Sequence, residues 1–267
     1  MRFDIDAYQA HSGRVTWDDL DLSVFRDRPV SDAGLRCLQY MHDIEFHTVC
    51  YLRDLLVTRA HDDHRVTTFL TIWNLEELYH GEALAAVLDA HGRPSGMGRV
   101  EPLRRRLGGA RQNVGTLASM VGSWAMRDFT AIHMMWGAVN EWTAQAAYGR
   151  LSSLESHPVL TALMKRLMRQ EGRHVDFYAS EAERRLAGNR RAQGLTRFAL
   201  RRYWGPVGSG VAPATDVSFM VRHLFGGEDG AKVADRIDRR IQRLPGLDGL
   251  EIVSRARAAH LRTPAAA

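Results

Sequence analysis

Four long segments of this chain each place a glutamate within an otherwise apolar face of helical period: Glu45, Glu77, Glu141 and Glu171. The first two glutamates are 32 residues apart and the last two are 30 residues apart. Each of these gaps suits half a helix, a turn and half a helix back. The middle gap of 64 residues is about twice as long, which suits one long crossover between two antiparallel pairs. The spacing therefore predicts an all-α fold, a four-helix bundle with one long crossover.

Local signals give the approximate limits of the four helices. We expect the helices at about 31–61, 63–90, 128–152 and 158–187. Ser31 is a good N-cap for the first helix, Gly92 is a good terminator for the second, and Pro158 suits the first turn of the fourth. Alternating apolar runs and Asn-Gly turns, which indicate strands and hairpins, are almost absent. These signals support the all-α prediction.

The segments outside the four helices are polar or basic. Residues 1–30 predict an irregular lead-in, and residues 93–127 predict a connection with one or two short helices. Beyond residue 190 a basic amphipathic segment precedes a loop rich in Gly, Pro and Ser, and shorter helices follow. We expect one domain over residues 1–267, with a core bundle at about 31–188 and a basic C-terminal helical appendage at about 190–262.

The composition excludes several classes of protein. Hydrophobic residues make up 45% of the 267 residues and charged residues 25%, which argues against a disordered or low-complexity chain. No uncharged apolar run is long enough for a membrane span. Asp4 and Asp6 lie where a signal peptide needs basic and apolar residues. Two cysteines, Cys37 and Cys50, are too few for a disulfide framework or a thiolate metal site. A cytoplasmic location is the resulting expectation.

Two of the four glutamates begin a Glu-x-x-His motif. The second helix contains Glu77-Leu78-Tyr79-His80, and the fourth contains Glu171-Gly172-Arg173-His174. Residues i and i+3 lie on the same side of a helix, so each motif directs a carboxylate and an imidazole toward one point. A single Glu-x-x-His is common on solvated helix faces. Two copies, each paired with another glutamate at a similar spacing, are much harder to obtain by chance.

The order Glu, Glu-x-x-His, Glu, Glu-x-x-His is the ligand set of ferritin-like bundles that bind two iron or two manganese ions. Two divalent cations would also offset the repulsion among four buried carboxylates. We expect Glu77 and Glu171 to bridge the metals. Glu45 and His80 would then bind one ion, and Glu141 and His174 the other. These six side chains are the predicted metal ligands and catalytic residues: Glu45, Glu77, His80, Glu141, Glu171 and His174.

The sequence around the ligands resembles the soluble acyl-carrier-protein (acyl-ACP) desaturases, especially their shorter actinobacterial branch. The segment from Trp73 to Gly81 is similar to the family's Trp-x-x-Glu-Glu-x-x-His-Gly motif. Gln170-Glu171-Gly172-Arg173-His174, followed by Tyr178, is similar to its Asp-Glu-x-Arg-His motif and the tyrosine one turn later. The resemblance covers about residues 30–190. It implies two iron ions per chain, with manganese or a mixed pair as the alternative, and dioxygen as co-substrate.

The resemblance also implies a substrate and partners. The substrate would be a fatty acyl chain, held on acyl carrier protein, and the electrons would come from a ferredoxin-type donor. A homodimer is expected on the same ground. The chain departs from the family at Gln170, where an aspartate is usual, at Tyr79, where an arginine is usual, and at Ala144, where a threonine is usual. These departures leave a hydroxylase, an N-oxygenase or a non-catalytic metal-binding protein as alternatives.

Basic residues gather toward the C-terminus. The net charge is +5, and the segment from residue 181 onward holds 16 Lys and Arg against 9 Asp and Glu. Such charge could dock an acidic carrier protein or, as a weaker alternative, a membrane surface. No nucleic-acid-binding motif accompanies the arginines, so nucleic acid is not an expected partner. The candidate docking residues are Arg104, Arg105, Arg106, Arg190, Arg191, Arg201 and Arg202.

Overall fold

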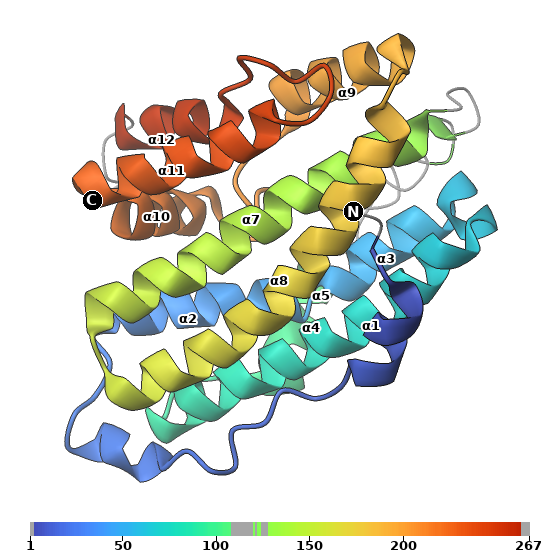
Figure 1. The fold of residues 1–267 in the computed structure, drawn as a ribbon. Helices are drawn as coiled ribbons and strands as arrows, with labels where there is room; N and C mark the ends of the chain where they lie inside the picture. The colour runs from blue at the N-terminus through green and yellow to red at the C-terminus, as the bar shows by residue number, and fades with distance from the viewer. Residues whose placement is uncertain (1–2, 108–119, 121, 124–127, 263–267) are drawn as a thin grey trace. The chain divides into compact units, whose positions relative to one another are not determined.

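The computed structural model describes residues 3–107, 120, 122–123 and 128–262, and every regular element among them is a helix (Figure 1). This confirms the all-α prediction. The chain divides into two compact units. The N-terminal unit holds residues 4–124 and 151–170, and the C-terminal unit holds residues 1–3, 125–150 and 171–267. The division falls inside two long helices, α7 and α8.

The N-terminal unit is built on two helices that pack side by side, α2 (Asp32–Glu45) and α4 (His64–Ala90) (Figure 1). Apolar side chains at helical spacing are buried along both, among them Leu38 and Met41 on α2 and Phe69, Leu84 and Val87 on α4. The remaining elements of this unit are α1 (Ile5–His11), η1 (Leu22–Arg26), α3 (Thr48–Leu56), η2 (Arg59–Asp62) and α5 (Gly96–Leu107).

The prediction of one helix over 31–61 is wrong in its second half, because α2 ends at Glu45 and α3 begins at Thr48. The Thr48 hydroxyl donates to the Glu45 carbonyl at 2.7 Å, and the His47 N–H donates to the Ile44 carbonyl at 2.8 Å. These local bonds compete with the helical ladder, although the apolar spacing continues through the break. The start was predicted correctly, since Ser31 accepts a hydrogen bond from the Gly34 N–H. Glu45 is consequently the last residue of α2.

The lead-in at 1–30 is not wholly irregular, because it contains α1 and η1. Asp4 caps α1 by accepting from the Ala7 N–H at 2.9 Å, and Asp21 caps η1 through the Ser23 N–H. Short helices of this kind have little apolar periodicity, so the sequence pattern does not predict them. Tyr8 of α1 is buried beside Phe69 of α4, with ring centroids 5.4 Å apart. Packing on α4 stabilises α1 where intrinsic propensity could not.

The other helix predictions agree with the structure to within a few residues. The second predicted helix is α4, capped by Asp63 and followed by Gly92 with a φ of 64°. The third is α7 (Phe129–Glu155) and the fourth is α8 (Pro158–Leu186). In the predicted connection at 93–127, α5 is a short helix, and residues 108–119, 121 and 124–127 lie outside the described residues.

The C-terminal unit contains the predicted basic segment as α9 (Arg190–Tyr203) and three further helices. These are α10 (Ala214–Phe225), α11 (Gly227–Gln242) and α12 (Ile252–Arg262), which pack on one another (Figure 1). Asp238 of α11 accepts hydrogen bonds from the Val253 and Ser254 N–H groups and so caps α12. Burial raises the pKa of the Asp238 carboxyl. The predicted short helices after residue 190 are thereby confirmed.

Gly81 allows a close approach that positions the end of α2. A Cβ atom added to Gly81 would lie 2.6 Å from Cε2 of Phe46, the residue that follows Glu45. The Phe46 ring is 5% exposed and has no room to withdraw without repacking. The absence of a side chain at Gly81 therefore lets Phe46, and with it the end of α2, lie against α4 beside His80.

We expect Gly81→Ala to lower the free energy of unfolding by about 1–3 kcal/mol, since the new methyl group overpacks a dense contact. Gly194→Ala is the matched control, because Gly194 is also inside a helix but nothing lies within 4 Å of an added Cβ. That control should gain about 0.5–1 kcal/mol from backbone entropy. Urea denaturation of the two variants measures both changes, and equal stability would contradict the close packing at Gly81.

Candidate metal centre

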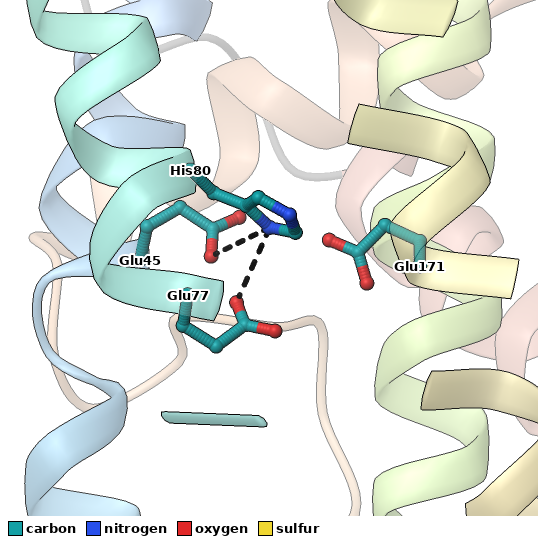
Figure 2. A group of neighbouring side chains, drawn as sticks. All are labelled: Glu45, Glu77, His80 and Glu171. Atoms are coloured by element: carbon teal, nitrogen blue, oxygen red, sulfur yellow. Dashed lines mark ion pairs between the residues drawn. The ribbon is translucent and has the colours of Figure 1, made fainter. Parts of the chain in front are cut away.

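Three predicted ligands lie together in the N-terminal unit. Glu45 ends α2, and Glu77 and His80 are one turn apart on α4. Nδ1 of His80 lies 4.0 Å from Oε2 of Glu45 and 3.8 Å from Oε2 of Glu77 (Figure 2). All three residues are buried, and His80 is 0% exposed. One imidazole nitrogen therefore faces two carboxylates in the interior.

The other three predicted ligands belong to the C-terminal unit. Glu141 lies on α7, and Glu171 and His174 lie one turn apart on α8. Nδ1 of His174 is 3.1 Å from Oε2 of Glu171. Glu171 and His174 are 0% exposed and Glu141 is 6% exposed. Both Glu-x-x-His motifs thus place their imidazole and carboxylate side by side, as helix geometry requires.

Ligand atoms of the six residues fall into two groups of four, in each of which they all lie within 4.8 Å of one another. The first group, drawn in Figure 2, is Glu45, Glu77, His80 and Glu171, and the second is Glu77, Glu141, Glu171 and His174. Carboxylate and imidazole donors suit divalent iron or manganese. Buried carboxylates at this separation repel one another, and a cation offsets that repulsion. The chemistry of the donor set therefore fits metal ions, and these groups could hold them.

A hydrogen-bond network that the sequence did not reveal lies behind His80. Nε2 of His80 is 2.9 Å from Oε1 of Gln170, and Nε2 of Gln170 donates to the Gly13 carbonyl at 2.7 Å and to Glu76 Oε1 at 3.2 Å. The Tyr8 hydroxyl in turn donates to Glu76 Oε2 at 2.7 Å. Glu76 adjoins a predicted ligand in the sequence, but nothing in the local pattern links it to Tyr8 or Gln170. Only the tertiary structure brings these residues together.

The network indicates that Nε2 of His80 carries a proton. Gly13 O and the Glu76 carboxylate are acceptors, so they orient the Gln170 amide with its NH2 group toward them. The Gln170 carbonyl oxygen then faces His80 and accepts from an Nε2–H. When the ring is neutral, its lone pair is then on Nδ1, on the side of Glu45 and Glu77. This is the nitrogen that a metal ion in the first group would take.

Other histidines near the ligands have structural surroundings. Nδ1 of His42 is 3.0 Å from Oδ1 of Asp43, and Nε2 of His42 accepts from the Gly96 N–H at 2.8 Å. Asp43 also accepts two hydrogen bonds from Arg99, so this cluster ties α5 to α2. Burial and the nearby charge of Arg104 lower the pKa of His47. Neither His42 nor His47 belongs to the two ligand groups.

Thr143 lies two residues after Glu141 on α7. The Thr143 hydroxyl donates to the Val139 carbonyl one turn earlier, at 2.8 Å, so its donor serves the backbone of α7. Tyr178, one turn after His174, is fully buried. A Cβ atom at Gly137 of α7 would lie 2.4 Å from the Tyr178 ring. Gly137 therefore allows α7 and α8 to approach closely in the C-terminal unit.

None of the described helices is both long enough and apolar enough to cross a membrane. No family model matches the chain, and searches of curated proteins and of solved structures also give no match. The residues of this chain are therefore the basis for its functional assignment.

We expect Fe²⁺ or Mn²⁺, added without oxygen, to raise the melting temperature, because a metal that binds the folded state stabilises it by about 2.7 kcal/mol at a hundredfold excess over Kd. Glu171→Gln removes one carboxylate from both groups. This variant should gain much less from metal, yet be at least as stable as the wild type without it, because a buried repulsion is removed.

Glu183→Gln makes the same change at an exposed position of α8 and is the control. Its melting temperature should match that of the wild type both with and without added metal. A wild-type melting temperature that metal leaves unchanged in calorimetry would contradict a metal site.

Proposed function

We propose that this protein is an oxidoreductase with two iron ions per chain, bound by a ferritin-like four-helix bundle. The observation that supports the proposal is that the two groups of ligand atoms share Glu77 and Glu171, as two bridging carboxylates would. Glu45 and His80 would complete one iron site, and Glu141 and His174 the other. The bundle would consist of α2, α4, α7 and α8, the four helices that carry these residues. Manganese, alone or with iron, is the alternative metal.

The proposed reaction is the oxidation of a fatty acyl chain by dioxygen, as the resemblance to acyl-ACP desaturases suggests. A reduced di-iron pair would supply two of the four electrons that dioxygen reduction requires, and a ferredoxin-type donor would replace them. In a desaturation, these two electrons and two protons from solvent, together with the two hydrogen atoms removed from the acyl chain, reduce dioxygen to two waters. The protein would contribute the buried carboxylates that hold the metals, the orientation of His80 through Gln170, and an interior from which water is excluded.

Hydroxylation or N-oxidation is the second candidate reaction, and one observation favours it. Ala144 stands where desaturases tend to have a threonine, and the neighbouring Thr143 donates its hydroxyl proton to the Val139 carbonyl. A desaturase-type threonine donor is therefore not supplied by these two residues. The product of the reaction distinguishes the candidates, because desaturation removes two hydrogens and hydroxylation adds one oxygen.

The decisive experiment is oxygen uptake by protein loaded anaerobically with Fe²⁺, with and without a long-chain acyl carrier protein and a ferredoxin reducing system. We expect uptake that depends on the acyl substrate, and a product whose mass reveals the reaction. Glu141→Ala should reduce the rate by about a hundredfold or more, since an outer iron ligand is lost, whereas the exposed Glu183→Gln should retain it. Metal binding without substrate-dependent uptake would instead indicate a non-catalytic metal-binding protein.

The acyl carrier protein would dock on the exposed face of α9. Arg190, Arg191, Arg201 and Arg202 are exposed on this helix, which contains no acidic residue, and of these Arg191 also pairs with Asp128 at 3.7 Å. Two large rings lie among them, Phe198 at 60% exposure and Tyr203 at 62%. An acidic carrier complements this charge. We call this exposed face, formed by these four arginines and two rings, the α9 face.

The arginines at 104–106 are less suited to docking. Arg104 donates to the Phe46 carbonyl, and Arg105 pairs with Glu101 on the same helix. The side chain of Arg106 lies outside the described residues. We therefore place the proposed docking site for the acyl carrier protein on the α9 face.

Arg201→Glu/Arg202→Glu should lower kcat/KM for the acyl carrier protein by about tenfold and weaken its dependence on salt, because charge complementarity raises the rate of encounter. Arg255→Glu/Arg262→Glu makes the same charge change at exposed positions of α12 and should have little effect. Equal loss in both variants would overturn a specific α9 site. Loss of binding to anionic vesicles with unchanged carrier kinetics would assign the α9 face to a membrane surface.

A further inference from the structure

We propose that Glu76 and Tyr8 are positioning residues that decide, through Gln170, which nitrogen of His80 is available to a metal. The inference rests on the proposed metal centre for its consequence, but not for its geometry. All the residues involved belong to the N-terminal unit. It gives the N-terminal helix α1 a role in a site whose ligands lie far along the chain.

The Glu76 carboxylate is held in place by three hydrogen bonds and in turn orients the Gln170 amide. Its side chain is fully buried, and its carboxylate accepts from the Tyr8 hydroxyl at 2.7 Å, the Gly13 N–H at 3.3 Å and the Gln170 amide at 3.2 Å. Several hydrogen bonds of this kind are needed to offset the cost of burying a carboxylate. Two of the three donors come from residues 8–13, the segment formed by the end of α1 and the residues just after it.

Gln170 differs chemically from a carboxylate at the same place. A carboxylate can only accept, so it would select the Nε2–H form of a neighbouring imidazole by itself. An amide can present either its oxygen or its NH2 group, and so can satisfy either tautomer of His80. Gln170 therefore needs a second residue to fix its orientation. Glu76 and the Gly13 carbonyl do this by accepting from its NH2 group.

The orientation of the amide has a direct consequence at His80. With this orientation of the amide, Nε2 donates to Gln170, and a neutral ring presents the lone pair of Nδ1 toward Glu45 and Glu77. If the amide flipped, its NH2 group would favour the tautomer with a lone pair on Nε2. The proton would then lie on Nδ1, which points toward the carboxylates and has to be deprotonated to bind a metal. Amide rotation and the availability of the ligand are thereby coupled.

Tyr8, which belongs to α1, helps to hold the Glu76 carboxylate in place. Its ring is buried beside Phe69, and its hydroxyl contacts the Glu76 oxygen that does not bond to Gln170. The Tyr8 hydroxyl thus holds Oε2 of Glu76, while Oε1 accepts from the Gln170 amide. Tyr8→Phe removes this bond and keeps the ring, so it tests the role of the hydroxyl with little change in packing.

The test uses metal-free protein and long-range ¹H–¹⁵N spectra of histidine, which report the tautomer of each ring. The signal of His80 is assigned by its loss in His80→Gln. We expect the wild type to hold His80 in the Nε2–H form. Glu76→Gln should populate the Nδ1–H form detectably, and Tyr8→Phe should do so to a smaller extent. The exposed change Glu183→Gln should leave the tautomer as in the wild type.

A double variant provides the rescue. Glu76→Gln/Gln170→Glu exchanges the amide and the carboxylate. The carboxylate at position 170 then accepts from Nε2–H of His80, and the amide at position 76 can donate to that carboxylate. We expect the Nε2–H form to return. In metal titrations Glu76→Gln should weaken one of two sites by about 10–100-fold, as is usual when a residue that orients a ligand is changed, and the double variant should recover affinity.

The outcomes separate this inference from the proposed function. Unchanged tautomer and metal affinity in Glu76→Gln and Tyr8→Phe would overturn the positioning role, whatever the protein binds. The expected tautomer changes in a protein that binds no metal would support the positioning of His80 and overturn the proposed function. Failure of the double variant to restore the Nε2–H form, while it remains folded, would also overturn the positioning role.

Discussion

The mutual repulsion of buried carboxylates is the constraint on which the rest of this structure depends. Glu45, Glu77, Glu141 and Glu171 are all at most 6% exposed, and they occur in groups whose ligand atoms lie within 4.8 Å of one another. Such an arrangement costs free energy unless something neutralises it. Divalent cations do so with the donor types present. The burial of these side chains is therefore the physical ground for the metal proposal.

The features around the proposed ligands hold these side chains in place. The break after Glu45 ends α2 at a proposed ligand, and Gly81 leaves room for the ring of Phe46, the residue that follows Glu45. Gly137 has the same effect for the Tyr178 ring in the C-terminal unit. Close approaches of this kind limit how far a helix can shift or rotate. Rigid helices rather than loops thus carry the ligands, as a precisely spaced site requires.

The hydrogen bonds behind His80 fix the orientation of its neighbour Gln170. The Gln170 amide could present either its oxygen or its NH2 group to His80. Glu76 fixes the orientation of the amide by accepting from the NH2 group. Because Tyr8 and Gly13 also contact Glu76, the first helix of the chain becomes part of this arrangement. The short helix α1 thus acquires both its stability and its proposed role from contacts with α4.

The sequence alone determined the helical class, the approximate limits of α4, α7 and α8, and the pairing of Glu and His within each motif, because helical periodicity and i,i+3 geometry are local properties. It did not determine the break after Glu45, the helix at Ile5–His11, or the contacts of Glu76 with Tyr8 and Gln170. The break rests on local hydrogen bonds that the continuing apolar spacing conceals, whereas the contacts of Glu76 join side chains that are 68 and 94 residues apart in the chain. Only tertiary packing decides such contacts, since local propensity carries no information about which distant side chain will share a buried position.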